Sequence, residues 1–353
     1  MMVSSQQQMA QWFLGLQNHL MRSSEWAYFQ NIYNQFSQNP SDLSAVSQFH
    51  RDLWNISFAD DNVRNHFLNA VREYHQNQLQ LKPVISKIPV DVMAKVNALE
   101  EKGHTPAFEI APEKIKAMRE HFEKRHTKDL NGNISEYALK DCIEAPHFLE
   151  IANDPKVLSV VENYLGVTPT IKVIEAWWSH AKKEEAKDAQ LYHLDYDDYK
   201  FCKLFIYLTD VNEDSGPHVY VEGTHTCEKV KDYVLKNSHR TEEFMAWYLK
   251  KLRKSDAEVK EYFGKEGQKL CGPAGTNFIV DTRGVHKGLL PKNTSRLLCQ
   301  VTYGITPQVP VPPPRLNKDE IEKLKMPSTF QSMPYAFINR LFLDFGESSV
   351  PRY

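Results

Sequence analysis

The spacing of apolar residues changes along the chain, from a helical period in the N-terminal part to a strand period from Thr170 onward. Apolar positions three or four residues apart predict amphipathic helices, and they occur in two early sets: Met9, Trp12, Phe13, Leu16 and Leu20, then Val63, Phe67, Ala70, Val71 and Tyr74. We expect breaks near Asn39-Pro40 and Phe58-Ala59-Asp60. We therefore interpret residues 1–85 as a helical extension that packs on the core or on a second subunit.

Two further helices are predicted before the strands begin. Lys82 to Pro89 reads as a linker, after which Ala111-Pro112-Glu113 places proline and an acid where a helix begins. Asp154-Pro155 is expected to cap another helix, which Gly166 ends.

Short alternating segments with Gly and Pro turns then dominate, and no regular strand-helix-strand repeat connects them. The expected strands lie in residues 170–178, 203–211, 219–222, 269–271, 276–280 and 296–303, with a helix inserted from Thr241. This order predicts an α+β protein with an antiparallel double-stranded β-helix, a jelly-roll or cupin-like core, over residues 86–306. Such a barrel has an open mouth suited to ligands. Residues 307–353 are expected to form a proline-rich tether and a helical tail that lies across the mouth or pairs subunits.

Composition narrows the class of protein. The 353 residues carry 43 Lys and Arg against 45 Asp and Glu, so no net field favours nucleic acid or an anionic membrane. Five scattered cysteines without a Cys-x-x-Cys pair argue against a disulfide framework or a zinc knuckle. Without a signal-peptide pattern or a membrane-length apolar run, we expect a cytoplasmic protein with a small-molecule partner. The N- or C-terminal helices are the candidate contacts for a homo-oligomer.

The candidate chemistry begins at Leu191-Tyr192-His193-Leu194-Asp195. In an extended segment His193 and Asp195 leave the backbone on the same face. An imidazole and a carboxylate so placed are two of the three ligands of a 2-His-1-carboxylate iron site. The third ligand has to come from a distant part of the chain, and His286, which follows the apolar run Phe278 to Val280, is the candidate.

The segments around these residues resemble the phytanoyl-CoA dioxygenase family of iron(II)- and 2-oxoglutarate-dependent oxygenases. They are a strand (203–211), the turn Glu213-Asp214-Ser215-Gly216-Pro217, a second strand and then Gly223-Thr224-His225, and the resemblance covers about residues 135–306. It implies iron(II) bound by His193, Asp195 and His286, with 2-oxoglutarate and O2 as co-substrates and ascorbate as an activator. In the family pattern the Gly-Thr-His histidine is not a ligand, so His225 and the nearby His218 are left out.

The far carboxylate of 2-oxoglutarate needs a cation with paired donors, which arginine supplies better than lysine. Arg296 lies ten positions after His286, where the family carries its 2-oxoglutarate arginine. Lys287-Gly288 stands where many relatives have an assisting serine or threonine, so we consider Thr302 and Gln300, which share a strand face with Arg296. Tyr207 shares a face with Lys203 and Phe205 and is expected near the co-substrate, while Leu204, Ile206 and Leu208 face the core.

The resemblance implies hydroxylation of a small molecule with release of succinate and CO2. A ligand carboxylate at Asp195 supports this, because halogenating relatives replace that residue to admit halide. Three alternatives stay open at this point: desaturation, epimerisation or cyclisation by the same chemistry; a cupin-like metal-binding module without turnover; and, more distant, a zinc hydrolase. Arg296 favours an enzyme over the module, which has no use for a carboxylate clamp beside its metal.

Overall fold

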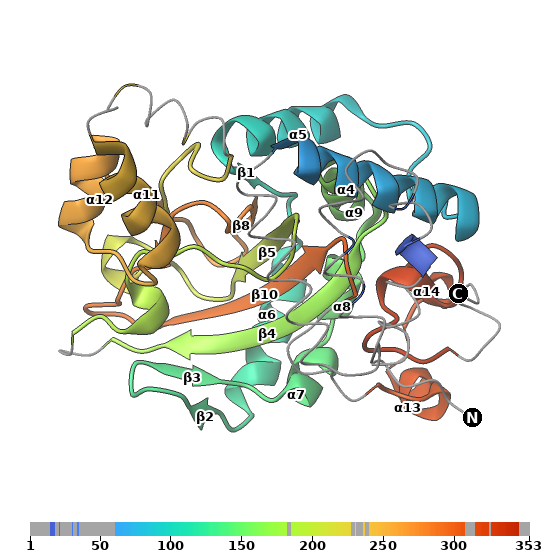
Figure 1. The fold of residues 1–353 in the computed structure, drawn as a ribbon. Coiled ribbons are helices and arrows are strands. Elements are labelled where there is room, and N and C mark those ends of the chain that lie inside the picture. Colours follow the sequence, from blue (N-terminus) through green and yellow to red (C-terminus); the bar gives the residue numbers. More distant parts are fainter. Residues whose placement is uncertain are drawn as a thin grey trace.

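Two antiparallel sheets form the centre of the computed structural model (Figure 1). The structure describes residues 15–17, 21, 30, 34, 61–181, 185–226, 230, 236, 240–307, 315–324 and 326–345. The seven-stranded sheet has the order β1-β8-β5-β10-β4-β3-β2 and the three-stranded sheet the order β7-β6-β9. Their bounds are β1 His104–Pro106, β2 Lys128–Asp129, β3 Ile134–Glu136, β4 Thr170–Ser179, β5 Phe201–Tyr207, β6 His218–Tyr220, β7 Gln268–Leu270, β8 Asn277–Val280, β9 His286–Gly288 and β10 Arg296–Gly304. The jelly-roll prediction is confirmed.

Alternation along the strands separates the core into layers. In β5, Leu204 and Ile206 point into the larger core between the seven-stranded sheet and the helices. Phe205 and Tyr207 point the other way and pack with Tyr220 of β6, in the space between the two sheets. This is the division of faces that period-2 alternation predicted for the strand.

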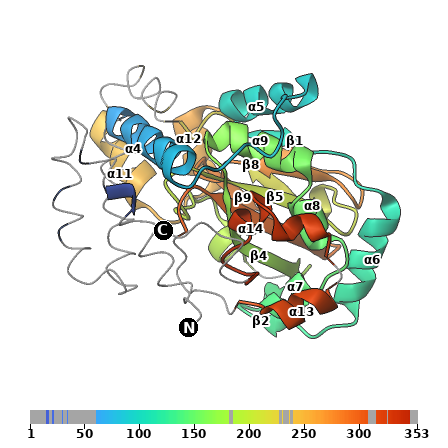
Figure 2. The same cartoon turned by 90° about the vertical axis from the view of Figure 1, so that its right-hand side faces the viewer.

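Helices cover the outer face of the seven-stranded sheet (Figure 2). They are α4 Asp61–Glu73, the π-helical turn η1 Tyr74–Gln78, α5 Val90–Lys102, α6 Pro112–Glu123, α7 Leu139–Ile143, α8 Phe148–Ala152 and α9 Pro155–Leu165. The start of α9 is capped as expected, because the Asp154 carboxylate accepts hydrogen bonds from the backbone N–H groups of Lys156 and Val157. Gly166 ends α9 at φ 78°, a conformation in which glycine carries no steric penalty.

A second pair of helices covers the outer face of the small sheet. The inserted helix is α11 Thr241–Lys250, and α12 Asp256–Phe263, which the sequence reading did not include, follows it. Phe244, Trp247 and Tyr262 from this pair pack on Val219 of β6 and on Val221, which follows it. Figure 1 shows both helices at the end of the molecule away from α13 and α14.

The N-terminal and C-terminal segments share the core of the main domain. The predicted helix around Phe67 and Val71 is α4, and both residues are buried in the larger core, whereas the set from Met9 to Leu20 lies almost wholly outside the described residues. The proline-rich residues 308–314 lie outside them too. Short helical segments follow, α13 Lys318–Lys323, the 3-10 turn η5 Ser328–Gln331 and α14 Tyr335–Ile338. The described tail packs on the helical side, with the rings of Phe337 and His75 5.2 Å apart, and not across the barrel mouth. Pairing of subunits by these segments stays a prediction.

The structure bears on two expectations from the composition, which concern the cysteines and membrane-spanning segments. Cys142, Cys202, Cys271 and Cys299 are free thiols, while Cys227 lies outside the described residues. Among the described helices, none combines the length and apolarity needed to cross a membrane.

Candidate metal centre

The fold brings His193, Asp195 and His286 together at one end of the space between the sheets. His193 and His286 face each other across an isolated antiparallel bridge, with backbone N···O distances of 2.9 and 3.1 Å. The backbone N–H of Asp195 donates to the Thr282 carbonyl at 2.9 Å, which fixes the segment that carries the carboxylate. One ligand atom from each of the three side chains lies within 4.8 Å of the others, an arrangement that can hold a metal ion.

Backbone hydrogen bonds set the orientation of both imidazoles. Nδ1 of His193 lies 2.9 Å from the Leu191 carbonyl oxygen, and Nδ1 of His286 lies 2.9 Å from that of Gly284. A carbonyl only accepts, so each Nδ1 carries a proton, and in the neutral form of the ring Nε2 then has the lone pair that a metal needs. The Nε2 atoms point at Asp195, 3.3 Å from Oδ1 for His193 and 3.4 Å from Oδ2 for His286. Such carbonyl contacts are how proteins orient metal-binding histidines.

Asp195 is held as a carboxylate by Lys203. The Lys203 ammonium lies 2.7 Å from Asp195 Oδ2 and 2.6 Å from Asp197 Oδ2. Burial by itself raises the pKa of Asp195, but the charge of Lys203 and the contacts with His286 and His193 outweigh it and hold the pKa well below its usual range. Burial together with the neighbouring His286 lowers the pKa of His193. These shifts favour a carboxylate at Asp195 and a neutral imidazole at His193, the charge states that a bound cation requires.

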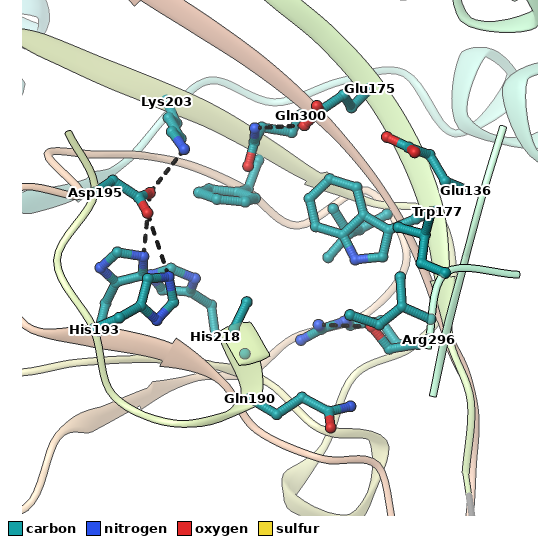
Figure 3. A pocket seen from close by; sticks show the side chains of 18 residues that line it. Glu136, Glu175, Trp177, Gln190, His193, Asp195, Lys203, His218, Arg296 and Gln300 are labelled. Carbon is teal, nitrogen blue, oxygen red and sulfur yellow. Dashed lines mark hydrogen bonds and ion pairs between the residues drawn. The ribbon is translucent and has the colours of Figure 1, made fainter. Parts of the chain in front are cut away.

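Arg296 lies on the opposite side of the same cavity (Figure 3). Its side chain is 3 % exposed, and its guanidinium donates to the Gly216 carbonyl and, at 3.2 Å, to Ser179 Oγ. Arg296 Nε has no hydrogen-bond partner, and within the part of the chain that the structure describes no carboxylate pairs with this cation. A buried guanidinium without a counterion fits a ligand carboxylate.

Of the other residues considered for the co-substrate site, only Gln300 lines the cavity in the described structure. The Tyr207 ring lies 5.9 Å from Arg296 Cζ, but its hydroxyl donates to the Leu270 carbonyl and accepts from the His218 N–H, and the residue does not line the cavity. Thr302 does not line it either, and six residues of strand, roughly 20 Å, separate it from Arg296. Gln300 does line the cavity, where its amide donates to Glu175.

The hydroxyl beside Arg296 belongs to Ser179, which the sequence reading missed. The two residues are direct cross-strand partners at the ends of β10 and β4. Gly288 lies close to the same guanidinium, since a Cβ built there would come within 3.3 Å of Arg296 Nη2. The register of two strands distant in sequence decides this contact, so no local signal could have revealed it.

His218, which the sequence analysis considered and left out of the ligand set, is a second cavity residue. Its ring stacks on His286 at a centroid distance of 5.3 Å, and its Nε2 has no partner. Burial, reinforced by the nearby His286 and Arg296, lowers its pKa well below the usual range, so the imidazole is neutral. His225, by contrast, is buried away from the cavity.

The cavity enclosed by these residues measures about 290 Å³. Figure 3 shows the His193–Asp195 side facing Trp177 and Arg296, with Glu175 and Gln300 along one edge and Gln190 along the other. This volume lies just below the range of about 300–1,000 Å³ that is typical of small-molecule sites.

The family model for phytanoyl-CoA dioxygenase matches residues 93–295, more than half of the chain. The chain belongs to the phytanoyl-CoA dioxygenase family. This makes it an iron- and 2-oxoglutarate-dependent enzyme, as the motif resemblance implied, and the match includes His193, Asp195 and His286 while ending one residue before Arg296.

Solved structures with a related fold were also found for this family member. The epimerase SnoN, in complex with Fe3+, 2-oxoglutarate and nogalamycin RO, shares 14% identity over 61% of this chain and 84% of its own, with a TM-score of 0.44. HygX from Streptomyces hygroscopicus, with nickel and 2-oxoglutarate, shares 16% identity over 60% and 86%, with a TM-score of 0.40. AviO1 from Streptomyces viridochromogenes Tue57 shares 16% identity over 65% and 99%, with a TM-score of 0.39. No curated protein matches the sequence. The family assignment rests on the family model.

Proposed function

We propose that His193, Asp195 and His286 hold iron(II) and that the enzyme hydroxylates a small molecule. The geometry supports the ligand set, because two Nε2 lone pairs and a carboxylate converge from a single side. A 2-His-1-carboxylate set leaves open positions on the opposite side of the metal. Bound there, iron(II) and 2-oxoglutarate supply the oxidising chemistry.

The observation that carries the proposal is the unpaired Arg296 in the cavity of the triad. A folded protein rarely buries a cation without a partner, because removing the charge from water costs several kcal/mol. The planar fork of Arg296 binds the distal carboxylate of 2-oxoglutarate, and Ser179 Oγ holds that fork in place at 3.2 Å. A non-catalytic metal-binding module has no need of this arrangement.

The remaining cavity residues position groups and exclude water. Lys203 fixes the Asp195 carboxylate, and the apolar pair Phe205 and Leu298 forms part of the cavity wall. Because Asp195 is present as a ligand, no position is left for halide, which favours hydroxylation over halogenation. Desaturation, epimerisation and cyclisation are the competing outcomes of the same chemistry.

The ligand set is tested by metal content and turnover together. We expect one iron(II) per wild-type chain under anaerobic loading, and loss of binding or of succinate formation in His193→Ala and in His286→Ala. His126→Ala, an exposed histidine outside the cavity, serves as the control and should behave as wild type. Full iron content and turnover in both ligand variants contradict the assignment.

The reaction type is tested on the product. With a substrate that stimulates succinate release, hydroxylation adds one oxygen atom from labelled O2 to the product, as mass spectrometry detects. Desaturation or cyclisation removes hydrogen and epimerisation leaves the mass unchanged, so any of these results replaces hydroxylation without changing the ligand assignment.

A further inference from the structure

One wall of the cavity is acidic and aromatic and takes no part in holding the metal or 2-oxoglutarate. Glu175 and Trp177 project from the same face of β4, and Glu136 of β3 is the direct cross-strand partner of Trp177. Figure 3 shows the Trp177 ring beside Glu136 and across the cavity from the side of Asp195, with Glu175 along the adjoining edge. A substrate in front of the triad therefore meets this wall.

Neither glutamate has a close ion-pair partner in the described structure, although the charge of Lys128, the cross-strand partner of Glu136 in β2, partly opposes the effect of burial on Glu136. Lys203, a cation that lines the cavity, is engaged by Asp195 and Asp197 at 2.7 and 2.6 Å. Among the described residues neither Glu136 nor Glu175 forms an ion pair, and Glu175 accepts only the Gln300 amide, at 3.0 Å. Among the ionised residues that line the cavity, Glu136, Glu175 and Asp195 outnumber Lys203 and Arg296 by one. Iron(II) and the two carboxylates of 2-oxoglutarate cancel in formal charge, so loading the site leaves one net negative charge.

Burial bears on both carboxyl groups. Desolvation raises the pKa of Glu175 to about 7 and also raises the pKa of Glu136. A carboxylate destabilised by burial gains most from an added cation, because the attraction is strongest where water is scarce.

The unpaired imidazole of His218 is separate evidence for a polar ligand in the cavity. His218 is 5 % exposed, it lines the same cavity, and its Nε2 has no partner. Buried polar groups are normally paired, so an unpaired imidazole nitrogen in the wall of the cavity points to a partner supplied by a bound molecule.

We propose that the substrate carries a protonated amine, which binds between Glu175, Glu136 and the face of Trp177. Two carboxylates beside an aromatic face are suited to an ammonium group, through ion pairing and cation–π attraction. This rests on the proposed function, since it places the amine group on the molecule that is oxidised. The amine anchors at the wall, and the part of the substrate facing the triad reacts.

The test uses three ring-matched probes of different charge: benzylamine, benzyl alcohol and benzoate. Each is titrated anaerobically into the enzyme loaded with iron(II) and 2-oxoglutarate, at about pH 8, where Glu175 is ionised. Binding is read by calorimetry and by the change in the absorption of the iron–2-oxoglutarate complex. We expect benzylamine to bind on the order of tenfold more tightly than benzyl alcohol, and benzoate more weakly than both.

Isosteric variants locate the effect. Glu175→Gln and Glu136→Gln should each reduce the preference for benzylamine, and the double variant should abolish it, while Glu120→Gln, on the exposed side of α6, keeps it. Iron content and thermal unfolding of every variant confirm that the site is intact.

The outcomes separate this inference from the proposed function. Benzylamine that binds no better than benzyl alcohol, or a preference that survives the double variant, refutes the amine site while iron binding and succinate release still stand. A wild-type protein that neither binds iron(II) nor forms succinate refutes both.

Discussion

Replacing Arg296 by methionine removes a buried cation that has no counterion in the described structure. The guanidinium donates to the Gly216 carbonyl and to Ser179 Oγ, and burial lowers the pKa of Arg296 despite the opposing influence of Tyr207. The substitution loses two hydrogen bonds, each worth about 1 kcal/mol. It also removes the desolvation of a charge, which costs several kcal/mol. We expect the ligand-free Arg296→Met protein to be within about 1 kcal/mol of wild type, or more stable.

Arg283 provides a matched control, because it is equally inaccessible but paired. Its side chain is 8 % exposed, and Nε lies 2.9 Å from both carboxylate oxygens of Asp281, which is itself fully buried. Arg283→Met leaves the Asp281 charge without its cation, a change that typically costs about 3–5 kcal/mol. The Tyr164 hydroxyl, which donates to Asp281 at 2.5 Å, offsets only part of this cost. The same substitution at two buried arginines should therefore have very different effects.

Binding of 2-oxoglutarate should show the reverse order. A hydrogen bond to a charged group contributes about 1.5–3 kcal/mol, so a paired contact with the distal carboxylate corresponds to roughly 100-fold or more in dissociation constant. Arg296→Met should lose this affinity, and Arg296→Lys should recover part of it because a point charge cannot reproduce the fork. Iron(II) affinity should stay near wild type in both.

Urea unfolding of the metal-free proteins measures the stabilities, and calorimetry on the anaerobic iron(II)-loaded Arg296 variants measures 2-oxoglutarate binding. A loss of about 3 kcal/mol or more in Arg296→Met without ligand would show that Arg296 is a structural residue. Unchanged 2-oxoglutarate affinity in Arg296→Met would remove it from the co-substrate site.

Two further predictions concern charges around the triad. Lys203→Met leaves Asp195 and Asp197 without their shared cation, so the metal-free protein should lose about 1–3 kcal/mol in urea unfolding, less than a fully buried pair because Asp197 is partly exposed. Added iron(II) should reduce the difference in unfolding free energy between wild type and Lys203→Met, because the cation neutralises Asp195. An equal loss with and without iron would count against Lys203 as the group that compensates the charge of Asp195. Burial raises the pKa of Glu175 to about 7, and the charge of Lys203 opposes this shift. The protonated Glu175 side chain therefore stabilises the fold at low pH, and the protein loses that stabilisation as the pH rises from about 4.5 to about 7. Glu175→Gln should remove this decrease of the unfolding free energy with pH, and at about pH 8 it should be more stable than wild type by at most about 3 kcal/mol. Identical pH profiles of the unfolding free energy in the two proteins would refute the raised pKa of Glu175.

Much of the fold was accessible from local patterns. All residues of β5 and β10 are buried, and alternate apolar residues of these strands join different hydrophobic clusters, as the period-2 pattern predicted for β5. The capping aspartate and terminal glycine of α9 lie where the sequence placed them. Helices α5 and α12 were missed although each carried a signal. Val92, Val96 and Leu99 give α5 a buried stripe. Ser255 and Glu258 form a capping box at the start of α12.

The site likewise contains residues that could be predicted from the sequence and contacts that could not. His193 and Asp195 are neighbours in sequence, so their common direction could be inferred from spacing, and family resemblance added His286 and Arg296. The contacts of Lys203 with Asp195 and of Ser179 with Arg296 depend on strand register and loop path. A one-residue shift in register would reverse either side chain, and no local pattern fixes that register.

Buried cations with and without a carboxylate partner also indicate where this fold binds a charged ligand. Away from the cavity, the buried Lys172 has Asp198 at 2.8 Å as its carboxylate partner, and the buried Arg283 has Asp281. Inside the cavity Arg296 has none. Since a ligand that binds only the folded state stabilises it in proportion to its affinity, the cost of this unpaired group is offset when 2-oxoglutarate binds. The ligand-free enzyme should therefore gain more stability from metal and co-substrate together than from metal alone, and Arg296→Met should remove that additional gain selectively.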